Sequence, residues 1–250
     1  MKYYGITDRG LVRKNNQDSY VIATNQANDV FAIVADGIGG NSGGDIASVM
    51  AVSLFSQAFS ETEGFQDAQQ ASQWISRMIS SVNYEIFSFG AGKPELRGMG
   101  TTLSGVMITS FGKIVVNIGD SRTYAWWKDG RMKQITMDHS LVNDMIMHGE
   151  LTPEEAKNSP RKNVLTNALG VWSTVRGDIH VHQEQMDGLL ICSDGLHGYV
   201  DEEKIRSILM NQDMDPSLRA RNLMKAALEA GGYDNVTVVL IDLEEDSHAI

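Results

Sequence analysis

The sequence is poor in the residues that build covalent cross-links or a basic surface. It has one cysteine, Cys192, so an intramolecular disulfide and a zinc site made of several thiolates are both excluded. Lysine and arginine number 21 against 32 aspartates and glutamates, which leaves a formal net charge of −11. Because nucleic acids and anionic membranes bind basic surfaces, this balance argues against both as partners and leaves metal cations open.

Long apolar runs and linkers are also lacking. No segment approaches the roughly 18 apolar residues of a membrane-spanning helix, so no membrane insertion is expected. The first residues have no apolar stretch typical of a signal peptide, and together with the single cysteine this favours the cytoplasm. There are only four prolines, no charged or Pro-rich linker and no internal repeat. The simplest organisation is therefore one domain, and nothing in the sequence demands more than a monomer.

Start signals and apolar periodicity predict helices in four places. The expected helices are 45–59 with Asp45 as the N-cap, 67–89, one opened by the capping box Thr152-Pro153-Glu154-Glu155, and one that runs from Asp215-Pro216 to Gly231.

Short runs of apolar and β-branched residues between these helices predict strands. The runs are 30–35, 103–108, 114–118, 189–192 and 236–243. The stretch 103–127 predicts consecutive hairpins with a turn at 111–113, and a further hairpin is expected around 128–130. Adjacent hairpins imply antiparallel sheet, so we expect an α+β fold in which helices cover antiparallel sheet.

Acidic side chains stand at the ends of several of these strands. Asp36 and Asp194 each follow a buried run and precede a glycine, Asp120 follows the run 114–118, and Asp234 precedes the last strand. An Asp-Gly pair after a strand is also an ordinary turn signal, and spacing alone does not prove that the strand ends converge. If they converge, several negative charges share a poorly hydrated space, which is strongly unfavourable unless cations neutralise them. Oxygen ligands without histidine or cysteine select Mg²⁺ or Mn²⁺.

Such a cluster of carboxylates predicts hydrolytic chemistry. Two ions bridged by an aspartate and a water lower the pKa of that water from about 15.7 towards 7 and can sit about 3.5–4 Å apart around an in-line displacement. Phosphoryl transfer suits this arrangement, because its catalysis is mostly positioning and charge neutralisation. The planar fork of Arg13 is the best candidate to hold the phosphate, with a solvated surface arginine as the alternative. No Gly-x-Ser-x-Gly elbow is present, so covalent catalysis has little support.

Eight short segments follow one another in order along nearly the whole chain. They are Thr7-Asp8-Arg9-Gly10, Arg13-Lys14-Asn15-Asn16-Gln17-Asp18, Val34-Ala35-Asp36-Gly37-Ile38-Gly39-Gly40, Met99-Gly100-Thr101-Thr102-Leu103, Asn117-Ile118-Gly119-Asp120-Ser121-Arg122, Asp138-His139-Ser140-Leu141-Val142, Cys192-Ser193-Asp194-Gly195-Leu196 and Gly231-Gly232-Tyr233-Asp234-Asn235-Val236-Thr237. Any one is weak, but the ordered set resembles the type 2C metal-dependent protein serine/threonine phosphatases, particularly their compact bacterial members.

The resemblance implies a four-layer α-β-β-α sandwich, in which two central antiparallel sheets are flanked by helices. It implies a single catalytic domain over residues 1–243, with a segment from about 138 to 170 that resembles the family's flap beside the active site. The acidic residues 244–250 would follow as a solvated tail.

The resemblance also implies the metal ligands. Asp36 matches the residue that bridges two Mn²⁺ or Mg²⁺ ions, and the carbonyl of Gly37 matches a ligand of one of them. Asp194 and Asp234 would complete the first-metal side. Asp120 matches a residue that, with Asp194, helps hold a third and weaker ion in bacterial relatives.

Further residues match positions around those ions. Arg13 matches the phosphate-binding arginine, Asp18 a carboxylate near the metal waters, and Asn235 a residue that supports the site. Two positions depart from the family's pattern. Gln17 stands where many relatives have glutamate, and Ile38 stands where some eukaryotic members have a histidine proposed as general acid, so the leaving-group proton must come from another source.

The implied activity is metal-dependent hydrolysis of phosphoserine and phosphothreonine in proteins, by attack of a metal-bridging water or hydroxide. The substrates would be proteins phosphorylated by a serine/threonine kinase in bacterial signalling. Two alternatives stay open: a non-catalytic regulatory protein on the same fold, and another two-metal phosphomonoesterase, for example one that cleaves nucleotides. The first is disfavoured because all the matched metal aspartates are present.

Overall fold

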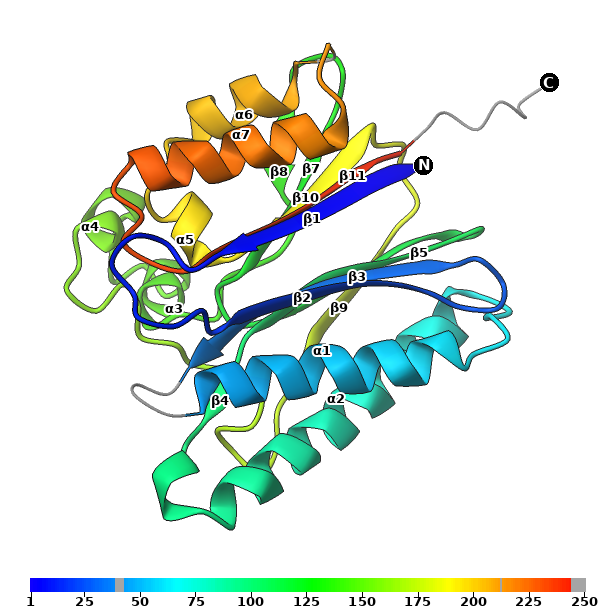
Figure 1. Ribbon diagram of the computed structural model, residues 1–250, viewed down its shortest axis with the longest axis vertical. Coiled ribbons are helices and arrows are strands. Elements are labelled where there is room, and N and C mark those ends of the chain that lie inside the picture. The colour runs from blue at the N-terminus through cyan, green and yellow to red at the C-terminus, as the bar shows by residue number, and fades with distance from the viewer. Residues whose placement is uncertain (39–42, 212, 244–250) are drawn as a thin grey trace.

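The computed structural model describes residues 1–38, 43–211 and 213–243, and its elements stack in four layers of helices, sheet, sheet and helices (Figure 1). The expected acidic tail, 244–250, and Gly39 and Gly40 of the third matched segment lie outside the described residues. The strands are β1 (Lys2–Asp8), β2 (Asp18–Thr24), β3 (Val30–Ile38), β4 (Gly100–Thr101), β5 (Leu103–Thr109), β6 (Gly112–Ile118), β7 (Arg122–Trp126), β8 (Met132–Gln134), β9 (Asp178–His182), β10 (Gly188–Cys192) and β11 (Val236–Asp242). The helices are α1 (Gly44–Ser60), α2 (Ala68–Ala91), the 3₁₀ turn η1 (Pro94–Leu96), α3 (Leu141–Met147), α4 (Pro153–Lys157), α5 (Asp194–His197), α6 (Glu202–Leu209) and α7 (Pro216–Glu229).

Two antiparallel sheets form the middle of the molecule. One has the strand order β1-β11-β10-β7-β8, and the other has the order β2-β3-β5-β6-β9 with β4 paired to β3. Helices α1 and α2 cover the second sheet, whereas α6 and α7 cover the first (Figure 1). The α+β sandwich expected from the hairpins and from the family resemblance is confirmed.

Strand β3 shows how the layers are held together. Phe31 and Ile33 belong to the apolar cluster under α1 and α2, whereas Ala32 and Val34 belong to the cluster between the two sheets. This alternation follows from the two-residue period of a strand, and burial on both faces explains the unbroken apolar run. The strand is thereby fixed in the centre of the molecule, and its C-terminal end carries Asp36.

The helix predictions are confirmed except for one cap. Asp67 accepts from the backbone of Gln70 at the start of α2, and Thr152 forms the expected capping box with Glu155. Asp45, in contrast, is not the cap of α1: the N-cap is Gly43, which makes no side-chain hydrogen bond. The backbone at that position is left-handed, with φ 108°, and glycine adopts such a conformation far more readily than other residues.

One strand connection was predicted wrongly. β5 and β6 form the expected hairpin, although its turn lies at 110–111, since Thr109 pairs with Gly112. β6 and β7, however, lie in different sheets instead of forming a second hairpin. Gly119, with φ 97°, bends the chain from one sheet to the other. Both strands are mostly buried, so their burial does not reveal which sheet each one joins.

The expected flap segment, 138–170, contains α3 and α4 and takes part in two isolated bridges. Ser140 bridges to Leu165 within the segment, and Leu169 bridges to Thr101 of β4. In the described ranges, no helix is both long enough and apolar enough to cross a membrane.

Candidate active site

Acidic side chains from both sheets meet at one end of the sandwich. Asp36, near the end of β3, stands opposite Asp18 at the start of β2. Asp194 is the first residue of α5, directly after β10, and Asp234 lies just before β11. The charges of all three, and that of Asp120, act on Asp36. The fold therefore brings together the strand-end aspartates that the sequence singled out.

The pKa values of these carboxyl groups are raised because the groups are buried close to one another. Burial, followed by repulsion from neighbouring carboxylates, raises the pKa of Asp120 to about 7 and that of Asp194 to about 6. Burial also raises the pKa of Asp18 to about 7. For Asp36, burial and four neighbouring carboxylates raise the pKa well above its usual range. Such groups favour protons or bound cations, because either one removes the repulsion.

Two buried carboxylate oxygens of this cluster have no hydrogen-bond partner among the described residues. Asp18 Oδ2 accepts from Ser193 Oγ and Thr237 Oγ1, both at 2.7 Å, while Asp18 Oδ1 is buried without a partner. Asp194 Oδ1 is buried without a partner as well. Buried polar atoms are normally satisfied, so these two oxygens mark a place for a cation or its water ligands.

The donor chemistry fits Mg²⁺ or Mn²⁺, since carboxylate oxygens are the ligands these hard cations prefer. Within residues 1–38, 43–211 and 213–243, however, no three His, Cys, Asp or Glu side chains are arranged so that they could hold a metal ion directly. Asp234 is engaged by Arg13, with 2.6 Å between Nη2 and Oδ2. Uncompensated carboxylates also repel one another. Cation binding would therefore require a local adjustment of side chains, that of Asp234 above all.

Two glycines allow the close backbone contacts on which the cluster depends. A Cβ on Gly37 would lie 2.1 Å from the carbonyl oxygen of Gly44, so only glycine lets the end of β3 approach the start of α1. A Cβ on Gly195 would lie 1.9 Å from the carbonyl oxygen of Asn235. This second contact places the aspartates that directly precede Gly195 and Asn235 beside each other.

Asn235 ties the loop between β1 and β2 to the cluster. Its Oδ1 accepts from the backbone N–H of Gln17, and its Nδ2 donates to the carbonyls of Arg9 and Asn15. Arg13 lies on this loop and is 53% exposed in its side chain. Its hydrogen bond to Asp234 raises the pKa of the guanidinium, and burial opposes part of this rise. The loop therefore holds one cationic, partly exposed fork beside the carboxylates.

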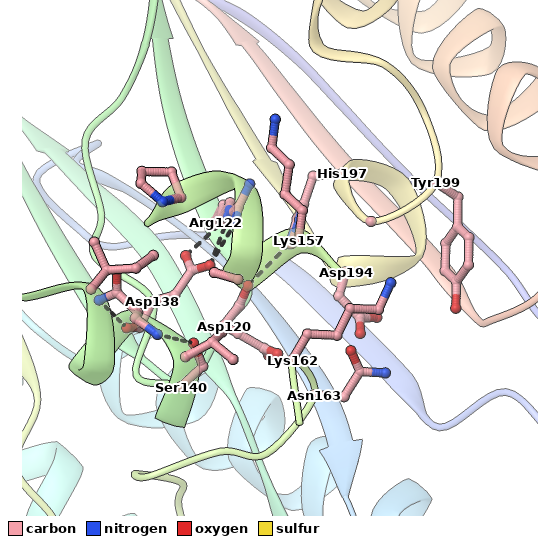
Figure 2. A pocket seen from close by; sticks show the side chains of 16 residues that line it. Asp120, Arg122, Asp138, Ser140, Lys157, Lys162, Asn163, Asp194, His197 and Tyr199 are labelled. Atoms are coloured by element: carbon pink, nitrogen blue, oxygen red, sulfur yellow. Dashed lines mark hydrogen bonds and ion pairs between the residues drawn. The ribbon is translucent and has the colours of Figure 1, made fainter. Parts of the chain in front are cut away.

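A cavity of about 480 Å³ adjoins the cluster (Figure 2). Asp120 and Asp194 line one side, while Lys157 and Lys162 enter from the flap segment. Tyr199, just after α5, lines the same cavity. The carboxylates and the flap thus border one space, large enough for a small ligand or for part of a larger one.

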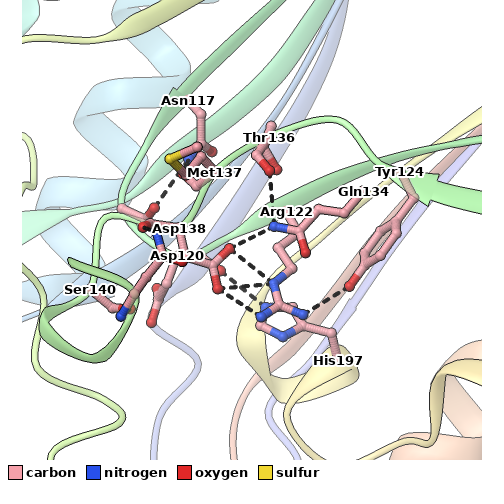
Figure 3. A network of polar contacts seen from close by, with 12 residues as sticks. Asn117, Asp120, Arg122, Tyr124, Gln134, Thr136, Met137, Asp138, Ser140 and His197 are labelled. Atoms are coloured by element: carbon pink, nitrogen blue, oxygen red, sulfur yellow. Dashed lines mark hydrogen bonds and ion pairs between the residues drawn. The ribbon is translucent and has the colours of Figure 1, made fainter. Parts of the chain in front are cut away.

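A second polar network fixes the base of the flap segment (Figure 3). Arg122 donates from Nε and Nη2 to both oxygens of Asp138, at 2.7–3.1 Å, and from Nη1 to the hydroxyl of Tyr124. Gln134 adds a further hydrogen bond to Asp138. Although burial opposes it, the bond with Asp138 holds the pKa of the Arg122 guanidinium above its usual range. This bidentate pair anchors the first residue of the flap segment to β7.

His197 is a polar group near the cluster that sequence reasoning did not single out. Its Nε2 lies 3.0 Å from the backbone carbonyl of Asp120, to which it donates in the neutral form. Burial, assisted by the nearby charge of Arg122, lowers the pKa of His197 to about 3. The ring is therefore neutral at physiological pH. Because α5 has only four residues, no periodic pattern could have assigned this side chain to the site.

Comparisons with known proteins match nearly the whole chain. A family model described as Protein phosphatase 2C matches residues 12–230. The serine/threonine phosphatase stp of Listeria innocua is 40% identical over 237 residues, which cover 94% of this chain and 93% of that protein. Protein phosphatase PhpP of Streptococcus pneumoniae is 36% identical over 242 residues, or 96% and 97% of the two chains. The crystal structure of a serine/threonine phosphatase from Staphylococcus aureus has a TM-score of 0.92 and 31% identity, covering 97% and 95%.

Proposed function

Because the chain belongs to the protein phosphatase 2C family, we propose that it hydrolyses phosphoserine and phosphothreonine esters in proteins with divalent cations held at its carboxylate cluster. Relatives named as serine/threonine phosphatases are 36–40% identical to it over more than nine-tenths of its length, which supports the same activity here. The observation that carries the proposal is the gathering of five aspartates from separate segments beside one exposed arginine.

The chain's own residues would divide the work of holding the cations. Asp36, the Gly37 carbonyl, Asp194 and Asp234 would hold two Mn²⁺ or Mg²⁺ ions, and Asp120 would help Asp194 hold a third, weaker one. Bound there, the ions would neutralise the cluster and lower the pKa of water so that hydroxide is available near neutral pH. The two buried unpartnered oxygens support this assignment.

Arg13 would bind and orient the phosphate. In the structure its Nη2 donates to Asp234, and its side chain is half exposed at the cluster. With Asp234 holding a cation instead, the guanidinium fork would be able to donate to two phosphate oxygens and so orient the phosphate for attack. Asp18, held by Ser193 and Thr237, would accept hydrogen bonds at Oδ1 from water in the site.

The structure offers no support for a covalent intermediate at the one cysteine. Cys192 is fully buried, and burial raises the pKa of its thiol to about 12, so thiolate is scarce at physiological pH. Ile38 has no proton to give, so the leaving serine or threonine oxygen must take its proton from elsewhere in the cleft.

The bacterial relatives also support a proposal for the domain organisation and the location of the protein. The relatives are bacterial, and the match spans 93–97% of their length, which supports one catalytic domain over residues 1–243 with a flap at about 138–170. We place the protein in the bacterial cytoplasm as a monomer that acts on the protein substrates of a serine/threonine kinase. A non-catalytic role is disfavoured because each matched aspartate lies at the cluster.

The proposal is tested by assaying phosphoserine and phosphothreonine peptides in parallel with nucleotides. We expect Mn²⁺ or Mg²⁺ to support peptide hydrolysis, EDTA to abolish it, and nucleotides to be poor substrates. Asp36→Asn should lower kcat/KM by at least about a hundredfold while circular dichroism shows a folded chain. Asp129→Asn, an exposed aspartate in the β7–β8 hairpin, is the matched control. Full activity of Asp36→Asn, or of the wild type in EDTA, would contradict the proposal.

A further inference from the structure

Two exposed tyrosines stand together beside the carboxylate cluster. The rings of Tyr199 and Tyr233 are paired, with centroids 5.5 Å apart at an angle of 38°. Despite this contact, 39% of Tyr199 and 54% of Tyr233 are exposed. Neither ring is therefore explained by packing into the core, in contrast to the buried aromatic residues under α1 and α2.

Two more exposed apolar residues continue this surface along the loop between β1 and β2. Leu11 is 68% exposed and Val12 is 61% exposed, and the backbone N–H groups of both donate to the carbonyl of Gly232. The side chain of Leu11 lies directly against Gly232, where a Cβ would come within 2.8 Å of its Cγ. We call Leu11, Val12, Tyr199 and Tyr233 the aromatic rim.

The aromatic rim is continuous with the cleft. Tyr199 lines the cavity beside Asp194, and in Figure 2 its ring stands on the α5 side. Tyr233 directly precedes Asp234 in the chain. The charges of Asp194, Asp234 and Arg13 all act on the hydroxyl of Tyr199. Tyr199 thus joins the rim to the cavity, and Tyr233 joins it to Asp234, the carboxylate to which Arg13 is bonded.

A protein substrate must lay its chain across such a rim. If its phosphate lies at Arg13, the residues on one side of the phosphorylated serine or threonine pass over the aromatic rim. Neighbouring exposed apolar side chains generally mark an interaction site, and tyrosine is enriched where interfaces gain most of their free energy. The rim itself carries no charged side chain, so it complements an apolar side chain better than an acidic or basic one.

We propose that the aromatic rim binds an apolar side chain that flanks the phosphorylated residue in the substrate, and that it thereby determines part of the specificity of the chain. The occupant is an extended segment of the phosphoprotein, with leucine or an aromatic residue beside the phosphoserine or phosphothreonine. This inference rests on the proposed function, since it assumes that the phosphate is bound in the adjoining cleft.

The test is a series of phosphopeptides that place either leucine or alanine at each position from three residues before to three residues after the phosphothreonine. For each position, kcat/KM of the leucine peptide is divided by kcat/KM of the alanine peptide. We expect a ratio of about ten at one position in the wild type, arising mainly from KM. In the double variant Tyr199→Ala, Tyr233→Ala the ratio at that position should fall to about one. Tyr84→Ala, which removes a similarly exposed tyrosine from α2, should keep it.

Each result decides the proposal, because a ratio within one variant is unaffected by a general loss of activity. A wild-type ratio near one at every position, or a ratio that the double variant keeps, would overturn the role of the aromatic rim while leaving the proposed phosphatase activity intact. A wild type that hydrolyses none of the peptides would contradict the proposed function instead, and the inference with it.

Discussion

Arg13 is bonded to the carboxylate cluster in the structure and is also the residue that we propose to bind the phosphate. In the described part of the chain, no other cationic side chain has a hydrogen bond to one of the clustered carboxylates. The Nη2 of Arg13 lies 2.6 Å from Asp234 Oδ2. Yet about half of its side chain is exposed to solvent. A cation that binds Asp234 would release the guanidinium, so the same group can stabilise the cluster without substrate and the phosphate with substrate.

Replacing Arg13 therefore tests its role at the phosphate. We expect Arg13→Ala to lower kcat/KM for a phosphopeptide about 10- to 100-fold, because a hydrogen bond to a charged group contributes about 1.5–3 kcal/mol. Arg13→Lys should restore part of the loss, since it keeps the charge but not the planar fork. The matched control is Arg131→Ala, an exposed arginine in the β7–β8 hairpin. Equal kinetics for Arg13→Ala and the wild type would contradict the assignment.

The buried ring of His197 should make the free energy of unfolding depend on pH. Its folded pKa is lowered to about 3 by burial, whereas an unfolded histidine titrates near 6.5, so below that pH protons bind the unfolded chain preferentially. The contribution of the neutral ring is complete above about pH 6.5 and is lost as the pH falls towards 3. Relative to His197→Gln, the wild type should lose up to about 1.4 kcal/mol of unfolding free energy per pH unit in this window. Urea unfolding at pH 7.5, 6 and 5 measures it, and parallel profiles would contradict the argument.

Among single residues, the sequence indicated the acidic ones of the site but not their hydrogen-bond partners. Asp36, Asp194 and Asp234 could be singled out because each borders a strongly apolar strand. Ser193 and Thr237, which both donate to Asp18, could not be assigned, since they are about 175 and 219 residues away from it in the sequence. Contacts of that range depend on the topology, which spacing does not reveal.

At the scale of elements, the cluster depends on how closely α5 approaches the loop before β11. Gly195 makes that approach possible, because its missing side chain leaves room for the backbone of Asn235. The strand β10 ends just before α5 and pairs with β11, so both flanking aspartates are carried by neighbouring strands of one sheet. The contact between these elements is what turns two distant sequence positions into one site.

Gly195→Ala should separate the two elements. Its Cβ would lie 1.9 Å from a backbone oxygen that cannot rotate away, so we expect a loss of about 1–3 kcal/mol in unfolding free energy and weaker Mn²⁺ binding. Gly92→Ala is the matched control, since the nearest atoms there lie at 3.7 Å and its φ is −76°. Urea unfolding and a calorimetric Mn²⁺ titration measure both effects. If the two variants bind Mn²⁺ equally well, the close contact is not needed for the site.

The elements also show which patterns a sequence carries clearly. The capped helices α2, α4 and α7 were predicted because Asp67, Thr152 and Asp215 cap them through local hydrogen bonds. The edge strands β1 and β2 were not predicted, and their side chains are mostly half-buried or exposed. β6 and β7 were predicted to form a hairpin but lie in different sheets: both strands are mostly buried, and only tertiary packing separates them.

At the scale of the whole molecule, the chain has a formal net charge of −11, and five of its 32 acidic residues gather at one end of the sandwich. Burial and mutual repulsion raise the pKa of Asp18, Asp36, Asp120 and Asp194 together. The repulsion within the cluster lowers the free energy of unfolding. Divalent cations bound there would raise it again, because ligands that bind only the folded state stabilise it. The acidic composition and the proposed metal dependence are therefore two aspects of one arrangement.

A crystal structure of the wild type grown with Mn²⁺, with the ions located by their anomalous scattering, tests this arrangement most directly. We predict two ions about 3.5–4 Å apart with Asp36 in contact with both, Asp194 and Asp234 on one of them, and Arg13 released from Asp234. Manganese bound elsewhere, or three aspartates that share no ion while Arg13 stays on Asp234, would contradict the account.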